Sequence, residues 1–193
     1  MNIVIIDYGA GNIKSIQFAF NRLGSNAILT SDAKTIQEAD KVIFPGVGEA
    51  SHAMKMLKAS GLDQLIPTLK QPVLGICLGM QLMCNSSEES NTKGLGIFKV
   101  EVKRFSNKVK VPQMGWNTIT HLNSDLFKGI SEGEYMYLVH SYYAEQCKES
   151  IATTNYEINY ASALQHENFY GVQFHPEKSS AAGEQLLKNF LAL

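Results

Sequence analysis

The sequence predicts an α/β fold: a mostly parallel, doubly wound sheet flanked by helices, with an antiparallel or mixed extension. Up to Gly94, short apolar runs alternate with longer segments of helical spacing, an order typical of parallel strands covered on both faces. After Gly94, strand-like runs follow one another and are joined by turns. No repeat, low-complexity tract or linker divides the 193 residues, so we expect one domain over 1–193.

The first half supplies the expected parallel strands and the helices that cover them. Residues 2–6 form an apolar run, and residues 13–23 then follow helical spacing until Gly24 ends the pattern. Further strands are expected at 27–30, 41–45 and 73–76, with a helix at about 52–59 and another that opens at Leu78. Ligands in open α/β sheets bind beyond the carboxyl ends of the strands, so residues just after these strands are candidates for a site.

The second half reads as a series of strands that extend the same sheet. They are expected at 97–105, 109–120, 135–142, 151–155 and 170–174. A final helix is expected over about 180–191. We interpret this half as an antiparallel or mixed extension and not as a second domain.

Charge and hydropathy argue against several classes of function. Lysine and arginine total 17 against 18 aspartates and glutamates, and this net charge of −1 gives no basic footprint for nucleic acid or an anionic membrane. No apolar run approaches the roughly 20 residues that a membrane span needs. The first strand follows Met1 with no signal-peptide pattern before it, so we expect a cytoplasmic protein.

The three cysteines, Cys77, Cys84 and Cys147, are an odd and sparse set that cannot form a closed disulfide framework. No spacing matches a zinc motif, so we expect reduced thiols and no metal site. Cys84 lies two turns beyond Cys77 on the helix expected at Leu78 and is interpreted as a core residue. Cys147 lies in a polar stretch and carries no functional signal.

Cys77 stands in the segment Gly75-Ile76-Cys77-Leu78-Gly79, between the strand expected at 73–76 and the next helix. The form G-x-C-x-G is the nucleophile-elbow pattern with cysteine in place of serine. Its glycines suit a sharp, strained turn at which bulkier neighbours would collide. The helix dipole favours a thiolate there, and the N–H of Leu78 can donate to a developing oxyanion. A buried cysteine without function is the alternative, and the paired glycines disfavour it.

A second candidate group ends the strand expected at 170–174. His175 is followed by Pro176 and Glu177, and residues i and i+2 of an extended chain project to the same side. Proline keeps the segment extended, so Glu177 can reach the imidazole. A cysteine nucleophile needs a base within reach and a third group that fixes the tautomer of the base. The sequence therefore predicts a Cys77, His175 and Glu177 triad.

The other histidines carry weaker signals. His52 and His121 are expected to be solvated, and His166 lies in a polar turn. His140, at the end of the strand with the sequence VHSYY, is expected to line the site without titrating.

Together these residues resemble a known family. The motifs Pro45-Gly46-Val47-Gly48, GICLGMQ from Gly75 and HPE from His175 are similar to those of class I (triad) glutamine amidotransferases and keep the same order. The resemblance spans nearly the whole chain and implies a flavodoxin-like sheet. The segments DYGAGNIKS, PQMGWN and YLVHSYY resemble the branch of the family that serves imidazole glycerol phosphate synthase in histidine biosynthesis.

The resemblance implies a role for each matched position. Cys77 would be the nucleophile, His175 the acid and base, and Glu177 the group that orients His175. The oxyanion hole would be formed by the backbone of four residues: Gly46, Val47, Gly48 and Leu78.

The same resemblance implies the substrate contacts. Glutamine would be held by Gln81, with its α-amino group at Glu89 and its amino-acid end at the backbone of Ser141 and Tyr142. No metal or organic cofactor is implied.

The chain shows no P-loop, dinucleotide fingerprint or second domain that could accept ammonia, so we expect a docked partner. The resemblance identifies this partner as a (β/α)₈-barrel cyclase subunit in a heterodimer. The expected interface residues are Asn12, Gln113, Met114, Trp116 and Lys178. Trp116, the only tryptophan, suits an exposed aromatic anchor, with a core position as the alternative.

Three other interpretations stay open at this point. The same chemistry could serve another acceptor, in surface-sugar amidination or in pyridoxal phosphate synthesis. A DJ-1-like or peptidase-like cysteine hydrolase also uses an elbow cysteine, but would not require Gln81 together with a C-terminal HPE. A catalytically silent binding module is disfavoured by the intact Cys77, His175 and Glu177 set.

Overall fold

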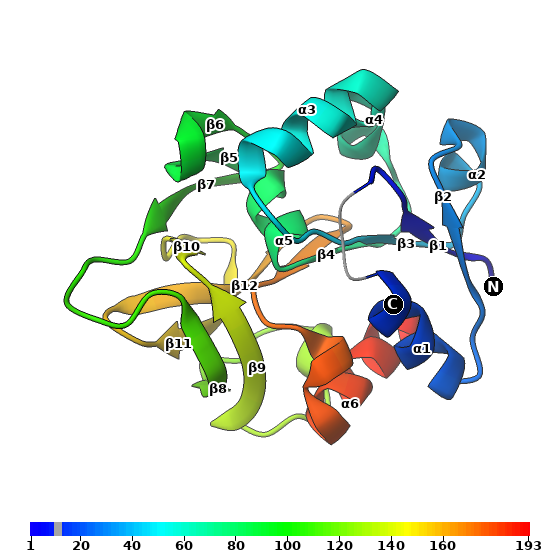
Figure 1. Ribbon diagram of the computed structural model, residues 1–193. Coiled ribbons are helices and arrows are strands. Elements are labelled where there is room, and N and C mark those ends of the chain that lie inside the picture. Colours follow the sequence, from blue (N-terminus) through cyan, green and yellow to red (C-terminus); the bar gives the residue numbers. More distant parts are fainter. Residues whose placement is uncertain (10–12) are drawn as a thin grey trace.

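A computed structural model describes residues 1–9 and 13–193 (Figure 1). The helices are α1 (Ile13–Arg22), α2 (Ala33–Gln37), α3 (Ala50–Ser60), α4 (Leu62–Leu65), α5 (Leu78–Met83) and α6 (Ser180–Ala192). The strands of the first half are β1 (Ile3–Ile6), β2 (Ala27–Thr30), β3 (Lys41–Phe44), β4 (Val73–Ile76), β5 (Cys84–Ser87) and β6 (Thr92–Lys93). Those of the second half are β7 (Phe98–Arg104), β8 (Gln113–Ile119), β9 (Glu134–His140), β10 (Tyr142–Ala144), β11 (Ser150–Asn155), β12 (Asn159–His166) and β13 (Phe169–Val172). Short 3₁₀ turns lie at Ile66–Thr68, Glu89–Asn91, Asp125–Phe127 and Pro176–Lys178.

The main sheet begins with five parallel strands in the order β2-β1-β3-β4-β13. Every residue of β1, β3, β4 and β13 is buried, as expected for strands covered on both faces. From β13 the sheet continues as β12-β10-β7-β5-β6, with antiparallel pairs except for β5 with β7, and β11 pairs with β12. The predicted fold class, a mostly parallel sheet with a mixed extension, is confirmed.

Helices cover the parallel part of the sheet on both faces (Figure 1). On one face Met54 and Leu57 of α3 pack with apolar residues of the sheet. On the other face Phe20 of α1 and Phe190 of α6 do the same. The apolar faces of these helices match the spacing expected from the sequence, and together they form two core layers around the sheet.

The strands β8 and β9 form a separate two-stranded sheet, which corrects the expectation that 109–120 and 135–142 extend the main sheet. Residues 109–112 lie outside β8, and the segment 135–142 is divided at Ser141, so β9 ends and β10 joins the main sheet. The pair is antiparallel, with Trp116 opposite Tyr137 and Met114 opposite Val139. Alternate residues therefore face the body of the protein and its surface.

Several elements carry too weak a pattern for sequence reasoning to find. Strand β12 was not expected, because its alanines and polar residues have low β propensity, yet pairing with β10, β11 and β13 buries it. The short elements α2, β5 and β6 were missed as well. The helix from Leu78 ends at Met83, so Cys84 begins β5 and does not continue the helix; its predicted core position is confirmed.

The carboxyl ends of β3, β4 and β13 lie side by side, because these strands run parallel in one sheet. The loop 45–49, the turn at Cys77 and the segment from Gln173 to Lys178 all leave the sheet at this edge. Of the helices that the structure describes, none has the length and hydropathy to cross a membrane.

Candidate active site

The turn from β4 into α5 holds Cys77 in a strained conformation. Its φ and ψ are 53° and −111°, outside the regions that side chains normally allow. A Cβ atom at Gly79 would lie 2.0 Å from the backbone oxygen of Phe44, and one at Gly75 would lie 2.8 Å from the Sδ of Met83. The glycines therefore let α5 approach β3 and the sheet closely. The predicted sharp turn is confirmed, with the thiol at the helix N-terminus.

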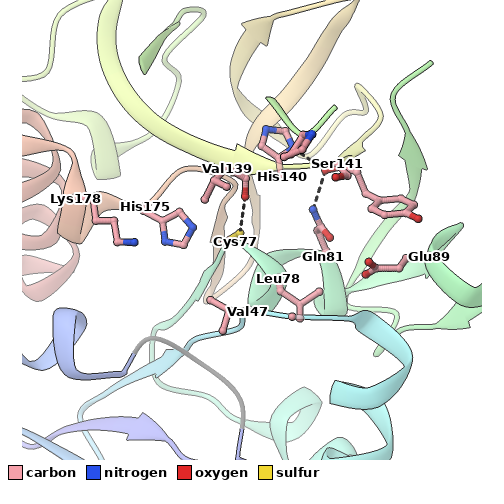
Figure 2. Close-up of a pocket in the computed structure, with 13 residues that line it drawn as sticks. Val47, Cys77, Leu78, Gln81, Glu89, Val139, His140, Ser141, His175 and Lys178 are labelled. Atoms are coloured by element: carbon pink, nitrogen blue, oxygen red, sulfur yellow. Dashed lines mark hydrogen bonds between the residues drawn. The ribbon is translucent and has the colours of Figure 1, made fainter. Parts of the chain in front are cut away.

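A pocket of about 350 Å³ opens at this turn (Figure 2). It brings together residues from the elbow, the 45–49 loop, the β9–β10 junction and the segment after β13. Its lining is Val47, Gly48, Cys77, Leu78, Gln81, Glu89, Pro112, Val139, His140, Ser141, Tyr142, His175 and Lys178. Figure 2 shows His175 on one side of the Cys77 sulfur, with Gln81 and Glu89 on the other.

His175 and Glu177 form a buried pair at the edge of the pocket. The His175 Nδ1 and the Glu177 Oε1 are 2.9 Å apart, and both side chains are almost fully buried. The backbone is fixed as well, since the His175 N–H donates to the Tyr137 carbonyl and the Ser179 hydroxyl donates to the His175 carbonyl. The contact between His175 and Glu177, which their two-residue spacing predicts, is therefore present.

The Cys77 sulfur and Glu177 both favour the protonated form of this imidazole. Burial lowers the pKa of His175, but interactions with the Cys77 thiol and with Glu177 outweigh burial and raise the pKa to about 10. Its Nε2 is buried and hydrogen-bonds to none of the residues that the structure describes. Nδ1 is held by Glu177, so Nε2 is the nitrogen left to exchange a proton within the pocket.

Two other groups contact the Cys77 sulfur. The Cys77 Sγ lies 3.9 Å from the Val139 carbonyl oxygen, which accepts a hydrogen bond from the thiol. The Nε2 of Gln173 donates to the sulfur at 3.7 Å from the buried side of the pocket. Sequence reasoning missed both, although Gln173 stands two residues before His175, and alternate positions of an extended segment share a side.

Of the four residues expected in the oxyanion hole, three belong to the 45–49 loop, and only two of these line the pocket. Val47 and Gly48 line the pocket, while Gly46 is buried against the elbow. A Cβ at Gly46 would lie 2.6 Å from the Gly79 nitrogen, so this residue permits close packing of the loop on α5. The Tyr8 hydroxyl donates to the Pro45 carbonyl at 2.8 Å and fixes the start of the loop.

The expected glutamine contacts Gln81 and Glu89 both line the pocket. The Nε2 of Gln81 donates to the Tyr142 carbonyl and to the Gln173 Oε1, each at 2.8 Å, so only its oxygen can face a ligand. The Glu89 Oε2 accepts from the Ala50 N–H at 2.8 Å. Burial and the charge of Glu49 raise the pKa of Glu89, while the Ala50 contact opposes them. Both side chains can therefore accept hydrogen bonds from an ammonium group.

The backbone of Ser141 and Tyr142 also reaches the pocket, as expected. The carbonyl of Ser141 accepts from the Phe105 N–H, and the carbonyl of Tyr142 accepts from Gln81 and from the His140 ring. Because both carbonyls are occupied, backbone contacts to a ligand would come from N–H groups, which suit a carboxylate.

His140 lines the pocket and stays neutral, as the sequence indicated. Burial lowers its pKa to about 4, outweighing the contact with the Tyr142 carbonyl. Its Nδ1 lies 2.7 Å from that carbonyl and its Nε2 lies 3.2 Å from the Tyr160 hydroxyl. The ring therefore acts as a fixed polar spacer in the wall of the pocket.

The remaining histidines and cysteines lie outside the pocket lining. His52 and His121 are exposed, as expected. His166 ends β12 instead of lying in a turn, with its Nδ1 3.1 Å from Glu149. Cys147 is half-buried, and its thiol accepts from the Ser150 hydroxyl.

The residues expected at a partner interface do not share one environment. Met114 and Trp116 are exposed at 65% and 52%, while Gln113 is 3% exposed and accepts from the Tyr160 hydroxyl. The Gln113 side chain therefore points away from the exposed face of β8, because neighbouring residues of a strand face opposite ways, and its place in a partner interface stays a prediction. Lys178 is exposed, lines the pocket, and its Nζ lies 5.9 Å from the centre of the Tyr137 ring. Asn12 lies outside the described residues.

Comparisons with known proteins find matches over nearly the whole chain. The family model described as "Glutamine amidotransferase class-I" matches residues 4–193. The imidazole glycerol phosphate synthase subunit HisH of Bacteroides fragilis (strain YCH46) is 55% identical, with all of both chains covered. That of Buchnera aphidicola subsp. Acyrthosiphon pisum (strain APS) is 48% identical over the full length of both chains. The solved structure of a putative GMP synthase subunit from Thermoplasma acidophilum has the same fold, with a TM-score of 0.78 at 18% identity, covering 100% of this chain and 92% of that one.

Proposed function

The chain belongs to the class I glutamine amidotransferase family, and from this premise we propose that its Cys77, His175 and Glu177 hydrolyse glutamine to glutamate and ammonia. Its function is that of the glutaminase subunit of imidazole glycerol phosphate synthase, in histidine biosynthesis. The observation that carries the proposed site is the shared pocket, in which the strained Cys77 and the His175–Glu177 pair meet.

The first half-reaction forms a thioester. In the proposed mechanism His175 holds the proton while the Cys77 sulfur attacks the carboxamide carbon of glutamine as a thiolate. The carbonyl oxygen becomes an oxyanion that accepts from the N–H groups of Leu78 and Val47, and such donors are typically worth about 2.7–4 kcal/mol each. When the C–N bond breaks, the His175 Nε2 gives its proton to the departing nitrogen, which leaves as ammonia.

The second half-reaction returns the enzyme to its starting state. Neutral His175 takes a proton from water, and the hydroxide oxygen attacks the thioester carbon at the same oxyanion site. Collapse of this intermediate expels the Cys77 thiolate and leaves the side-chain carboxyl group of glutamate. Glu177 holds the His175 Nδ1 at 2.9 Å and stabilises the imidazolium.

The position of the glutamine follows from the charges around the pocket. The carboxamide lies at Cys77, and the α-amino group lies at Glu89 and the Gln81 oxygen on the far side of the sulfur (Figure 2). The α-carboxylate then meets the backbone N–H groups of Ser141 and Tyr142. Glu89 and the backbone N–H groups of Ser141 and Tyr142 would then contact the two charged groups on the Cα of one glutamine.

The partner is a cyclase subunit with a (β/α)₈ barrel, and it docks on the outer face of the β8–β9 sheet. Met114 and Trp116 offer an apolar centre there, and Lys178 at the pocket mouth offers a charge at its margin. Ammonia in water is mostly protonated at neutral pH and is then no nucleophile. A sheltered passage to the barrel lets it react with the phosphoribulosyl nucleotide to give imidazole glycerol phosphate and aminoimidazole carboxamide ribotide.

The full-length relatives favour this acceptor over surface-sugar amidination and pyridoxal phosphate synthesis, and the family model argues against a DJ-1-like hydrolase. One glutaminase domain over 1–193, a location in the cytoplasm and a heterodimer with the cyclase complete the proposal.

The test combines the chain with the barrel subunit of its own synthase. We expect slow glutamate release from the isolated chain and a marked rise when the barrel subunit is added together with its nucleotide ligand. The reason is the 45–49 loop, whose Gly48 has a φ of +95° and whose Val47 amide can be reoriented by a docked partner. Full activity of the chain alone, unaltered by the partner, would contradict the proposal.

A further inference from the structure

Gln173 is a fully buried polar residue in contact with the nucleophile. It follows the last residue of β13 and is 0% exposed. Its Nε2 donates to the Cys77 sulfur at 3.7 Å, and its Oε1 accepts from the Gln81 Nε2 at 2.8 Å. Because Gln173 lies behind the wall of the pocket and is not among the lining residues, it contacts the sulfur without contacting the substrate.

The orientation of its amide is set by a backbone carbonyl. The Tyr142 carbonyl can only accept, so the group that Gln81 presents to it must be the NH₂. The second hydrogen of that NH₂ points at Gln173, which must therefore present its oxygen. The NH₂ of Gln173 is then directed at the sulfur. The Tyr142 carbonyl thus determines that Gln173 presents its NH₂ group, and not its oxygen, to the Cys77 sulfur.

The carbonyl that sets this orientation is itself held in place. The His140 Nδ1 is 2.7 Å from it, and the ring is neutral, so this nitrogen carries the hydrogen and donates. The Tyr160 hydroxyl lies 3.2 Å from the other ring nitrogen but donates to Gln113, so the connected set consists of His140, the Tyr142 carbonyl, Gln81 and Gln173. A connected set of buried polar groups resists rotation of any single member, which keeps the Gln173 amide in one orientation.

We propose that Gln173 is a positioning residue that stabilises Cys77 as a thiolate and holds its sulfur in the pocket, an inference that rests on the proposed glutaminase function. The Val139 carbonyl on another side of the sulfur favours the thiol, since a carbonyl oxygen repels a thiolate. An amide N–H does the reverse, because a donor binds the charged form more strongly than the neutral one. Gln173 and the His175 imidazolium therefore both stabilise the thiolate form of the Cys77 sulfur.

The test measures alkylation of Cys77 by iodoacetamide as a function of pH, in a Cys147→Ser background and with the modified peptide identified by mass. Gln173→Met removes the donor while keeping a long side chain. We expect the alkylation rate at neutral pH to fall about tenfold, the midpoint of the profile to move to higher pH, and the plateau at high pH to be unchanged. A purely structural role would lower the plateau and leave the midpoint in place.

Two further variants make the result specific. Gln71→Met removes another half-buried amide, which donates to the Ile36 carbonyl far from the pocket, and should leave the profile unchanged. Gln173→Glu keeps the acceptor for Gln81 but places a carboxylate oxygen at the sulfur, so the midpoint should move further than in Gln173→Met. A wild-type profile in either folded Gln173 variant would overturn the proposal.

The alkylation assay needs no glutamine, so it separates this inference from the proposed function. If the wild-type complex released no ammonia while Gln173→Met still moved the midpoint, the function would fail and the role of Gln173 would stand. In an active complex, Gln173→Met should lower kcat about tenfold with KM nearly constant, because Gln173 does not line the pocket and Gln81, which loses its bond to Gln173, is still held by the Tyr142 carbonyl. A raised KM with unchanged kcat would contradict the assignment.

Discussion

The elbow and the β8–β9 sheet are two walls of one pocket that are built in opposite ways. At the elbow, Gly75 and Gly79 let α5 lie directly on the sheet, and every residue of α5 is buried. The β8–β9 sheet stands apart from the main sheet, and its outer face exposes Met114 and Trp116. Its contact with the Cys77 sulfur is a single carbonyl, that of Val139.

This difference indicates a division of labour. A nucleophile must be held to within a fraction of an ångström, and close-packed, glycine-dependent contacts provide that rigidity. A surface that meets a partner must expose apolar side chains, which a core cannot do. We expect changes in the first region to affect chemistry or folding, and changes in the second to affect assembly.

The largest expected effect is on catalysis at the elbow. Cys77→Ala should lower glutamine hydrolysis by the complex about 10⁶-fold, because no other group can form the thioester. The complex should still use added ammonia at alkaline pH, since the cyclase is unaltered. Measurement of glutamate release and of cyclase product separates the two. Cys147→Ser, at a half-buried thiol outside the pocket lining, is the matched control and should keep both activities.

Removing the charge behind His175 should have the next largest effect. Glu177→Gln should lower kcat by about 10³-fold, because the imidazolium loses its partner and Nδ1 its defined tautomer. The pKa of His175 should fall from about 10 towards its usual value of 6.5, so activity should decline at lower pH than in the wild type. Glu184→Gln, which removes an exposed ion pair with Lys188, should not change the pH–rate profile.

The same pair predicts a pH dependence of stability. A histidine whose pKa is higher in the folded state stabilises the protein fully below the unfolded value, and this contribution is lost as pH rises through the folded value. The wild type should therefore lose unfolding free energy between pH of about 6.5 and about 10. Urea unfolding across this range should show a shallower loss for Glu177→Gln than for the wild type. Equal slopes would contradict the assigned coupling.

The close packing of the elbow predicts a loss of stability. Gly79→Ala places a Cβ 2.0 Å from the Phe44 oxygen, so the helix must move, and the free energy of unfolding should fall by about 3 kcal/mol. Gly24→Ala has open space but a φ of +73°, and should cost only about 1 kcal/mol. Urea unfolding of both variants tests the argument. Equal losses of unfolding free energy in the two variants would contradict the claim that Gly79 is needed for close packing of α5 on β3.

The same contrast explains which features the sequence could predict. The elbow could be predicted because its determinants are local: two glycines flank Cys77, an apolar strand precedes it and a helix follows. His175 and Glu177 are also two residues apart on one segment. The position of β13 next to β4, which brings His175 to the elbow, depends on pairing between distant segments, and no local pattern specifies that register.

Long-range pairing also explains the errors in the second half. The alanines and polar residues of β12 form a strand because β11 and β13 supply partners on both sides. The burial of the Gln113 side chain could have been predicted, since the two-residue period puts it on the opposite face from Met114. Gln173 could not be found by motif, because its importance lies in a contact with Cys77 that only the tertiary structure creates.

The smallest effect is expected on the exposed face of the β8–β9 sheet, and it tests the other side of the comparison. Trp116→Ala should weaken binding of the barrel subunit by a factor of at least about ten, since aromatic anchors dominate interface energies. The isolated chain should keep its unfolding free energy, because Trp116 is 52% exposed. Ile28→Ala, at a 48% exposed residue on the edge strand β2, should change neither quantity. Calorimetric titration of each variant with the barrel subunit measures the affinity. Wild-type affinity in Trp116→Ala would show that the partner docks elsewhere and would contradict the assignment of the β8–β9 sheet to assembly. A large loss of unfolding free energy would instead show that Trp116 stabilises the sheet itself.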